Sequence, residues 1–354
     1  MRFGKYLARS FAIIATLYTG FLILITLSNK EPEEMLMRKG LKAGLIEVNQ
    51  SSSSMYKELD KRFAERRQHV RKACEKHGLQ KPNKNYKANA WEFLVNKEHG
   101  LVWCNIFKAA SSTWFYNFNL LAGYTKKHLA KSKNTPVQLA RKYYNRPSVD
   151  ELLEILHGES RPLAFLITRH PLERLVSYYR NKFFDRRADS HIKKLCKTIT
   201  SQYPKLPVVQ SDGCGRMTPS FVQFAFYVVD YFTPQVLESM GTGVGNAQLD
   251  MHSMHWVPMN SFCTPCLVDF DVYAKVETMD EDGNYIIEKT GVSDVIKMAQ
   301  INKSTDVKKR LEEADALICQ LTEEVLLRLI DLYRYDVDLF QYDVTKYINC
   351  TRGR

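Results

Sequence analysis

The sequence lacks the glycine-rich motif G-x-x-x-x-G-K-[ST] that cradles nucleoside triphosphates, and its acidic residues are outnumbered by basic ones. The missing motif excludes a classical P-loop nucleotide triphosphatase. The chain has 51 lysines and arginines against 39 aspartates and glutamates, which gives a formal net charge of +12. This basic excess favours a polyanionic partner, such as nucleic acid, anionic lipid, an anionic glycan or a phosphorylated cofactor. The hydrophobic content of 45% is that of a globular protein.

Residues 10–29, "SFAIIATLYTGFLILITLSN", contain no charged side chain. A helix of this length and apolarity spans a bilayer. Arg2, Lys5 and Arg9 precede it, and positive charge before a span favours a cytoplasmic N-terminus. A cleaved signal peptide is the alternative, but the apolar run is long and no clear A-x-A site follows it. We therefore expect a cytoplasmic tail at 1–9, a signal-anchor helix at 10–29 and a lumenal remainder.

Features of the remaining chain agree with a lumenal address, which argues against a nucleic acid partner. An even number of cysteines in a translocated chain is compatible with disulfides, whose pairing the sequence leaves open. The eight cysteines are Cys74, Cys104, Cys196, Cys214, Cys263, Cys266, Cys319 and Cys350. Three N-x-[ST] sequons, each weak evidence alone, predict glycosylation at Asn49, Asn302 and Asn349.

The organisation of the lumenal part follows from where large apolar residues occur. Residues 30–90 are polar and charged, and we expect a lumenal stem there, with a helix possible over Met55–Lys76. The globular signal begins near Trp91, so residues 91–354 are expected to form the catalytic domain.

Short apolar runs alternate with helical patterns in this domain. Strands are predicted at 101–107, 161–168 and 271–277, and helices at 111–124, 171–184, 218–231 and 306–333. This alternation predicts an α/β fold with a central, mostly parallel sheet flanked by helices.

The stretch "NIFKAASSTWFY" is the first strand-to-helix junction with a chemical signal. Unpaired N–H groups and the positive dipole end of a helix suit a phosphate. Lys108 adds a full charge, and Ser111, Ser112 and Thr113 add hydroxyl donors, with Ser111 or Ser112 as the expected N-cap. The alternative is an ordinary capped helix after a strand.

The second junction is "TRHPLERLVSYYRNKF", which places Arg169 at a strand end and Ser177 two turns into a helix. Arg174 and Arg180 lie on the same helix, so a solvated basic helix is the alternative. Because parallel strands end along one edge of a sheet, the two junctions together predict a ligand with two separated phosphate groups.

These two junctions resemble the phosphate-binding segments of the Golgi carbohydrate sulfotransferases, in particular the chondroitin 4-O-, dermatan 4-O- and HNK-1 sulfotransferase group. "RHPLERLVSYYRNKF" is similar to that group's R-[DE]-P-[FL]-x-R-[LF]-[VL]-S-x-[YF]-R-[ND]-K-[FL] signature. "HWVPMNSFCTPCLVDFDVYAKVETMDED" and "LYRYDVDLFQY" are similar to its later blocks, so the resemblance covers roughly residues 91–345. The chain departs from the pattern at Phe107, where the group has proline, and at His170, where it has an acidic residue.

The resemblance implies a P-loop-like sulfotransferase fold and transfer of a sulfuryl group from 3′-phosphoadenylyl sulfate (PAPS) to a glycan hydroxyl, with GalNAc of chondroitin or dermatan as the expected acceptor. It also implies a single-pass type II protein of the Golgi membrane. The implied donor-binding residues are Phe107, Lys108, Ala109, Ala110, Ser111, Ser112 and Thr113, together with Arg169, His170, Pro171, Leu172, Glu173, Arg174, Leu175, Val176 and Ser177. Two other functions remain as alternatives. One is an inactive relative that binds anionic glycans in the Golgi lumen. The other is a phosphotransferase, but the missing glycines and the absence of an obvious paired-Asp magnesium site argue against it.

The catalytic assignments follow from the chemistry of the implied reaction. Lys108 is expected to stabilise charge on the departing phosphate, so no metal is required. His255 in the "HW" block is the expected general base, with His252, His170 and Glu277 as alternatives. Cys263 and Cys266 in "CTPC" are expected to form structural disulfides rather than a zinc site.

Acceptor specificity is expected to reside in loops at 124–160 and 185–217. The basic run at 186–197 is a candidate contact for an anionic polysaccharide, with a solvated surface run as the alternative.

Overall fold

The computed structural model describes residues 55–83, 86–186, 188–233, 236, 252–298 and 307–353. The expected tail at 1–9, the expected anchor at 10–29 and the sequons at Asn49 and Asn302 lie outside these residues. None of the helices in the described ranges is long and apolar enough to cross a bilayer. The chain divides into two compact units, Met1–Asp60 and Lys61–Arg354, and only residues 55–60 of the first are described, as helix.

A four-stranded sheet forms the centre of the larger unit, in the order β1 (Phe93–Asn96), β2 (Leu101–Cys104), β3 (Leu163–Thr168) and β6 (Val272–Lys275). β2, β3 and β6 run parallel, whereas β1 is antiparallel to β2. The register pairs Cys104 with Leu166 and Thr168 with Lys275, so the three parallel strands end at one edge. The side chains of β2 are completely buried, as expected of a strand covered on both faces.

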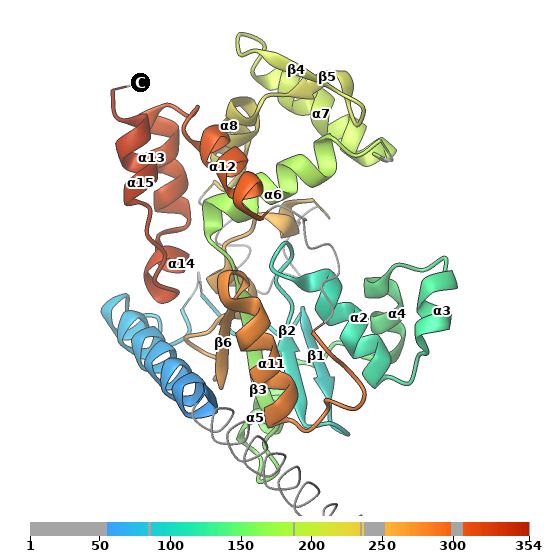
Figure 1. The fold of residues 1–354 in the computed structure, drawn as a ribbon. Coiled ribbons are helices and arrows are strands. Elements are labelled where there is room, and N and C mark those ends of the chain that lie inside the picture. Colours follow the sequence, from blue (N-terminus) through green and yellow to red (C-terminus); the bar gives the residue numbers. More distant parts are fainter. Residues whose placement is uncertain are drawn as a thin grey trace, which may run out of the picture. The chain divides into compact units, whose positions relative to one another are not determined.

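Helices flank this sheet, which confirms the predicted mixed α/β class with a mostly parallel centre (Figure 1). α11 (Met279–Lys289) packs against β6, and α6 (Pro171–Phe183) packs against α12 (Val307–Ile318). The remaining helices are α2 (Ser111–Leu121), α3 (Lys126–Lys131), α4 (Pro136–Tyr143), α5 (Val149–His157), α7 (Ser190–Gln202), α8 (Phe221–Tyr231), α10 (Met259–Cys263), α13 (Glu323–Leu332), α14 (Arg334–Leu339) and α15 (Thr345–Thr351). Short 3₁₀ turns cover η1 (Ser253–His255) and η2 (Val276–Thr278).

Several predicted elements are shorter or divided. The helix expected at 306–333 is two helices, because Thr322 caps a new one by accepting a hydrogen bond from the N–H of Val325. The loops expected at 124–160 and 185–217 contain helices α3 to α5 and α7, and the second also contains the hairpin β4 (Val208–Ser211) and β5 (Gly215–Pro219). A helix covers residues 55–76, the same range that the sequence predicted.

The last part of the stem expected at 30–90 packs into the core of the larger unit, which begins at Lys61. Phe63, Val70, Ala73 and Cys74 are all at most 4% exposed. Their spacing puts them on one face of a helix, where a few apolar residues among many charges are enough to dock it.

Four disulfides use all eight cysteines, which confirms the prediction of structural disulfides. Cys263 bonds Cys104 at the end of β2, and Cys266 bonds Cys74 in the N-terminal helix. The "CTPC" segment therefore joins the sheet to this helix, and neither cysteine is a free thiolate for zinc. The other bonds are Cys196–Cys214 and Cys319–Cys350.

Candidate active site

The loop between β2 and α2 turns without glycine because two other residues adopt left-handed backbone conformations. Lys108 has φ 69° and Ala110 has φ 58°. Such conformations are unfavourable for residues with a Cβ, and strain of this kind collects at functional sites. Ala110 is the N-cap of α2 and no side chain caps the helix, so the expectation that Ser111 or Ser112 is the cap is wrong.

The N-terminus of α2 has several donors with no partner in the part of the chain that the structure describes. The N–H groups of Ala110, Ser111, Ser112 and Thr113 donate to no protein oxygen, and the three hydroxyls make no hydrogen bond. Alternating left- and right-handed residues create a concave cluster of N–H groups that suits an anion. The side chain that was expected to cap the helix is therefore available to a ligand instead.

Two arginines of the second junction fix the carbonyl groups of this loop. Arg174 Nε donates to the Phe107 carbonyl at 3.0 Å, and a terminal nitrogen of Arg169 donates to the Lys108 carbonyl at 3.3 Å. Arg174 also donates to the Val257 carbonyl at 2.8 Å, and its side chain is almost fully buried. The two junctions predicted from sequence thus lie in direct contact, with Arg174 inside the fold supporting the loop.

Lys108 points toward α6, where its Nζ donates to Asn181 Oδ1 at 2.9 Å. Burial, together with the charges of Arg169 and Lys182, lowers the pKa of Lys108 to about 7. A lysine held in an electropositive environment without a carboxylate partner is suited to receive an anion. Asn181 was missed by the sequence reasoning, although it lies one helical turn after Ser177 and therefore on the same face of α6.

A cleft of about 1120 Å³ lies between α6 and α12, and Arg169, Ser177 and Asn181 line it. Buried Arg169 Nε has no hydrogen-bond partner there. Glu173 lines the same cleft, and burial raises the pKa of its carboxyl group. The same burial makes the Glu173 carboxyl group harder to ionise than that of an exposed glutamate.

The other residues of the second junction hold α6 in place. Pro171 occupies the first helical turn as predicted, and Leu172, Leu175 and Val176 are buried in the core. His170 is 6% exposed, its N–H donates to Glu277 at 3.0 Å, and its ring contacts the Asp343 carbonyl at 3.1 Å. Burial lowers the pKa of His170, which favours a neutral ring.

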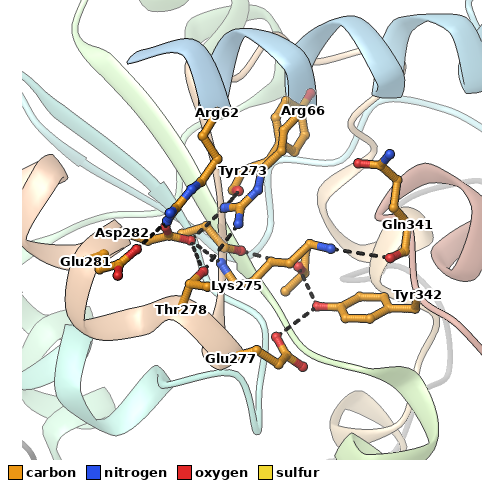
Figure 2. Close-up of polar contacts among 12 residues, drawn as sticks. Arg62, Arg66, Tyr273, Lys275, Glu277, Thr278, Glu281, Asp282, Gln341 and Tyr342 are labelled. Atoms are coloured by element: carbon orange, nitrogen blue, oxygen red, sulfur yellow. Dashed lines mark hydrogen bonds and ion pairs between the residues drawn. The ribbon is translucent and has the colours of Figure 1, made fainter. Parts of the chain in front are cut away.

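A polar network behind the sheet edge accounts for the "KVETMDED" block (Figure 2). Asp282, which is fully buried, accepts hydrogen bonds from Arg62, Arg66 and Thr278. Glu277 accepts from the His170 N–H and lies 3.4 Å from the Tyr342 hydroxyl. Because both oxygens of Glu277 are engaged, the structure favours a positioning role for it over that of a base.

His255 lies beside the first junction, because its ring packs on the Phe107 ring with the centroids 4.7 Å apart. The Tyr178 ring of α6 packs on it as well, at 5.2 Å. Phe107, which replaces the proline of the sulfotransferase pattern, therefore contacts the histidine expected to act as the base. His252 is one 3₁₀ turn away, and its carbonyl accepts from the His255 N–H at 2.9 Å.

The C-terminal segment supports the "HW" block. Asp336 is fully buried and accepts hydrogen bonds from the N–H groups of Met259 and Asn260, at 2.6 and 2.7 Å. The Tyr333 hydroxyl donates to the Trp256 carbonyl at 2.7 Å. Further along, the sequon residue Asn349 is exposed on α15, as a glycosylation site requires.

Comparisons with known proteins agree with this geometry. Residues 91–343 match the Sulfotransferase family. The chain is 26% identical to carbohydrate sulfotransferase 11 of Danio rerio over 96% of this chain and 92% of that protein. It is 28% identical to carbohydrate sulfotransferase 11 of Mus musculus, over 72% of this chain and 68% of that protein. It is 26% identical to carbohydrate sulfotransferase 14 of Danio rerio, over 70% of this chain and 61% of that protein.

No solved structure matches the chain significantly. The family match covers both strand-to-helix junctions, the "HW" block and most of the C-terminal pattern. The resemblance to carbohydrate sulfotransferases that the motifs predict is therefore confirmed, and the chain belongs to the sulfotransferase family.

Proposed function

We propose that this enzyme transfers a sulfuryl group from PAPS to a hydroxyl group of a glycan. The observation that carries the proposal is the position of Lys108. It lies in a strained loop with open N–H groups and donates to Asn181, which lines the cleft together with Arg169 and Ser177. A donor with two phosphate-bearing ends requires two anion sites of this kind, close together and fixed by the fold.

The unsatisfied donors of the site fit such a molecule. The N–H groups of Ala110 to Thr113 and the hydroxyls of Ser111, Ser112 and Thr113 would hold the 5′-phosphosulfate. Arg169, whose buried Nε lacks a partner, and Ser177 would hold the 3′-phosphate. When bound there, PAPS supplies the sulfuryl group that is transferred.

The chain contributes charge and proton transfer at fixed positions. As the bond from sulfur to the phosphate oxygen breaks, protonated Lys108 stabilises the charge that develops on that oxygen. As the acceptor oxygen forms its bond to sulfur, His255 takes the proton of the acceptor hydroxyl. Asn181 orients Lys108, and the packing of Phe107 and Tyr178 orients the ring of His255.

We further propose GalNAc of chondroitin or dermatan as the acceptor and the Golgi lumen as the location. The carbohydrate sulfotransferases to which the chain is similar support a glycan acceptor. The charge-free stretch at 10–29 would anchor the protein in the membrane, with residues 91–354 forming the catalytic domain in the lumen. The exposed Asn349 would then face glycosylation enzymes.

The experiment that tests this proposal is incubation of purified full-length protein with sulfur-labelled PAPS and a panel of desulfated glycans. We expect label on chondroitin or dermatan, at a GalNAc hydroxyl after digestion to disaccharides. Binding of the nucleotide with transfer to no glycan would instead favour the inactive, glycan-binding relative.

A further inference from the structure

The cleft between α6 and α12 has a second basic wall that the two sequence junctions do not supply. Arg310 and Lys309 of α12 line the cleft opposite Arg169 and Ser177 of the α6 side. Neither residue belongs to a segment on which the resemblance depends.

Arg310 differs from its neighbour Arg180 in its partners. Arg180 forms an ion pair with Glu313, and this pair joins α6 to α12 across the cleft. Arg310 has no ion pair within the described ranges, and its Nε atom is buried without a hydrogen-bond partner. A buried guanidinium nitrogen without an acceptor is costly unless a ligand supplies one.

Arg169, on the opposite wall, has the same deficiency. Its Nε atom is also buried and unsatisfied. Burial lowers the pKa of Arg169, the nearby Glu173 carboxylate opposes this shift, and the positive charge of Arg310 adds to it. Two guanidinium groups that repel each other across a cleft leave a position where a doubly charged anion is favourable. Both present planar donor forks that match phosphate oxygens.

We propose that Arg310 completes the 3′-phosphate subsite and determines the preference for a 3′-phosphorylated nucleotide, an inference that rests on the proposed function. Arg169 and Ser177 contact the phosphate from the α6 side, and Arg310 contacts it from α12. The ion pair of Arg180 with Glu313 positions Arg310 by fixing α12 against α6. The subsite therefore requires a helix more than a hundred residues beyond the second junction.

The test compares two ligands that differ only in the 3′-phosphate, adenosine 3′,5′-bisphosphate and adenosine 5′-monophosphate. Their affinities are measured by calorimetry for purified full-length wild type, Arg310→Gln and Arg310→Lys. We expect Arg310→Gln to lose about tenfold or more in affinity for the bisphosphate, because a charge-assisted hydrogen bond is lost. Its affinity for the monophosphate should stay within about twofold, and Arg310→Lys should recover part of the loss, since the charge remains.

Lys308→Ala is the matched control, because Lys308 is exposed on the same helix and pairs only loosely with Glu312 at 3.9 Å. It should leave both affinities unchanged. Equal losses for the two ligands in Arg310→Gln, or no loss for either, would overturn the proposal. If wild type binds neither nucleotide, the proposed donor is wrong, and this outcome is distinct from a failure of the Arg310 assignment. Thermal unfolding of each variant shows whether the variant is folded.

Discussion

Lys108 has opposite effects on folding and on the chemistry that we propose. The folded protein holds it in a strained conformation, partly buried near two other cations, with a pKa of about 7. These features destabilise the ligand-free protein and favour binding of an anion. The sequence showed that a lysine and three hydroxyls follow a strand, but it showed neither the strained backbone nor Asn181.

The stability of the Lys108→Met variant tests this balance. Because the folded pKa of about 7 is below the unfolded value of 10.5, the unfolded chain binds more protons between these values, and wild-type stability rises with pH there. Below pH 7 the folded protein holds a partly buried charge near other cations, so we expect Lys108→Met to unfold at a higher temperature than wild type at pH 6. The difference should narrow by pH 9, as measured by thermal unfolding.

Lys126→Met, at an exposed position of α3, is the control and should change the unfolding temperature at neither pH. A Lys108→Met protein that is less stable than wild type at pH 6 would show that Lys108 contributes to folding rather than opposing it.

The helix at 61–76 shows how an element far from the loop supports the site. Arg66 donates to Asp282 at 2.6 Å, to the Tyr273 carbonyl at 2.8 Å and to Thr278 at 3.2 Å (Figure 2). Asp282 also accepts from the Lys275 N–H at the end of β6. The helix therefore fixes the strand end from which Glu277 reaches His170.

We expect Arg66→Ala to reduce the free energy of unfolding by about 3 kcal/mol, because it leaves a buried carboxylate with one arginine fewer. Urea unfolding of the oxidised protein measures this loss. Lys61→Ala on the same helix removes an exposed pair with Glu65 at 3.9 Å and should cost at most about 0.5 kcal/mol. Similar losses of unfolding free energy in the two variants would mean that the network around Asp282 stabilises the fold no more than an exposed ion pair does.

Across the whole molecule, the sequence predicted what depends on local patterns. The three parallel strands, α2, α6 and the convergence of Arg169 with the Lys108 loop follow from apolar runs and parallel-sheet geometry. Long-range partners left no local signal, which is why the docking of residues 61–83 and the position of Arg310 in the cleft were not predicted. Three apolar side chains and the Cys74–Cys266 disulfide dock that helix, a pattern too sparse to separate from a polar stem.

The disulfides also show this limit. Cysteine parity predicted that bonds form, whereas their pairing depends on which segments the sheet brings together. Cys104 meets Cys263 only because β2 ends beside α10, although 159 residues separate them along the chain.

The most direct test of the proposed reaction is the rate of sulfuryl transfer by Lys108→Ala at saturating PAPS, measured with labelled donor and the glycan that wild type modifies. Calorimetry with adenosine 3′,5′-bisphosphate, run in parallel, separates chemistry from binding. We expect the variant to bind this nucleotide through Arg169 and Ser177 but to transfer sulfate about 100-fold more slowly or worse, because one charged donor to the leaving oxygen is lost. A variant that transfers sulfate at the wild-type rate would contradict the assignment of Lys108 and of its loop as the leaving-group side of the site.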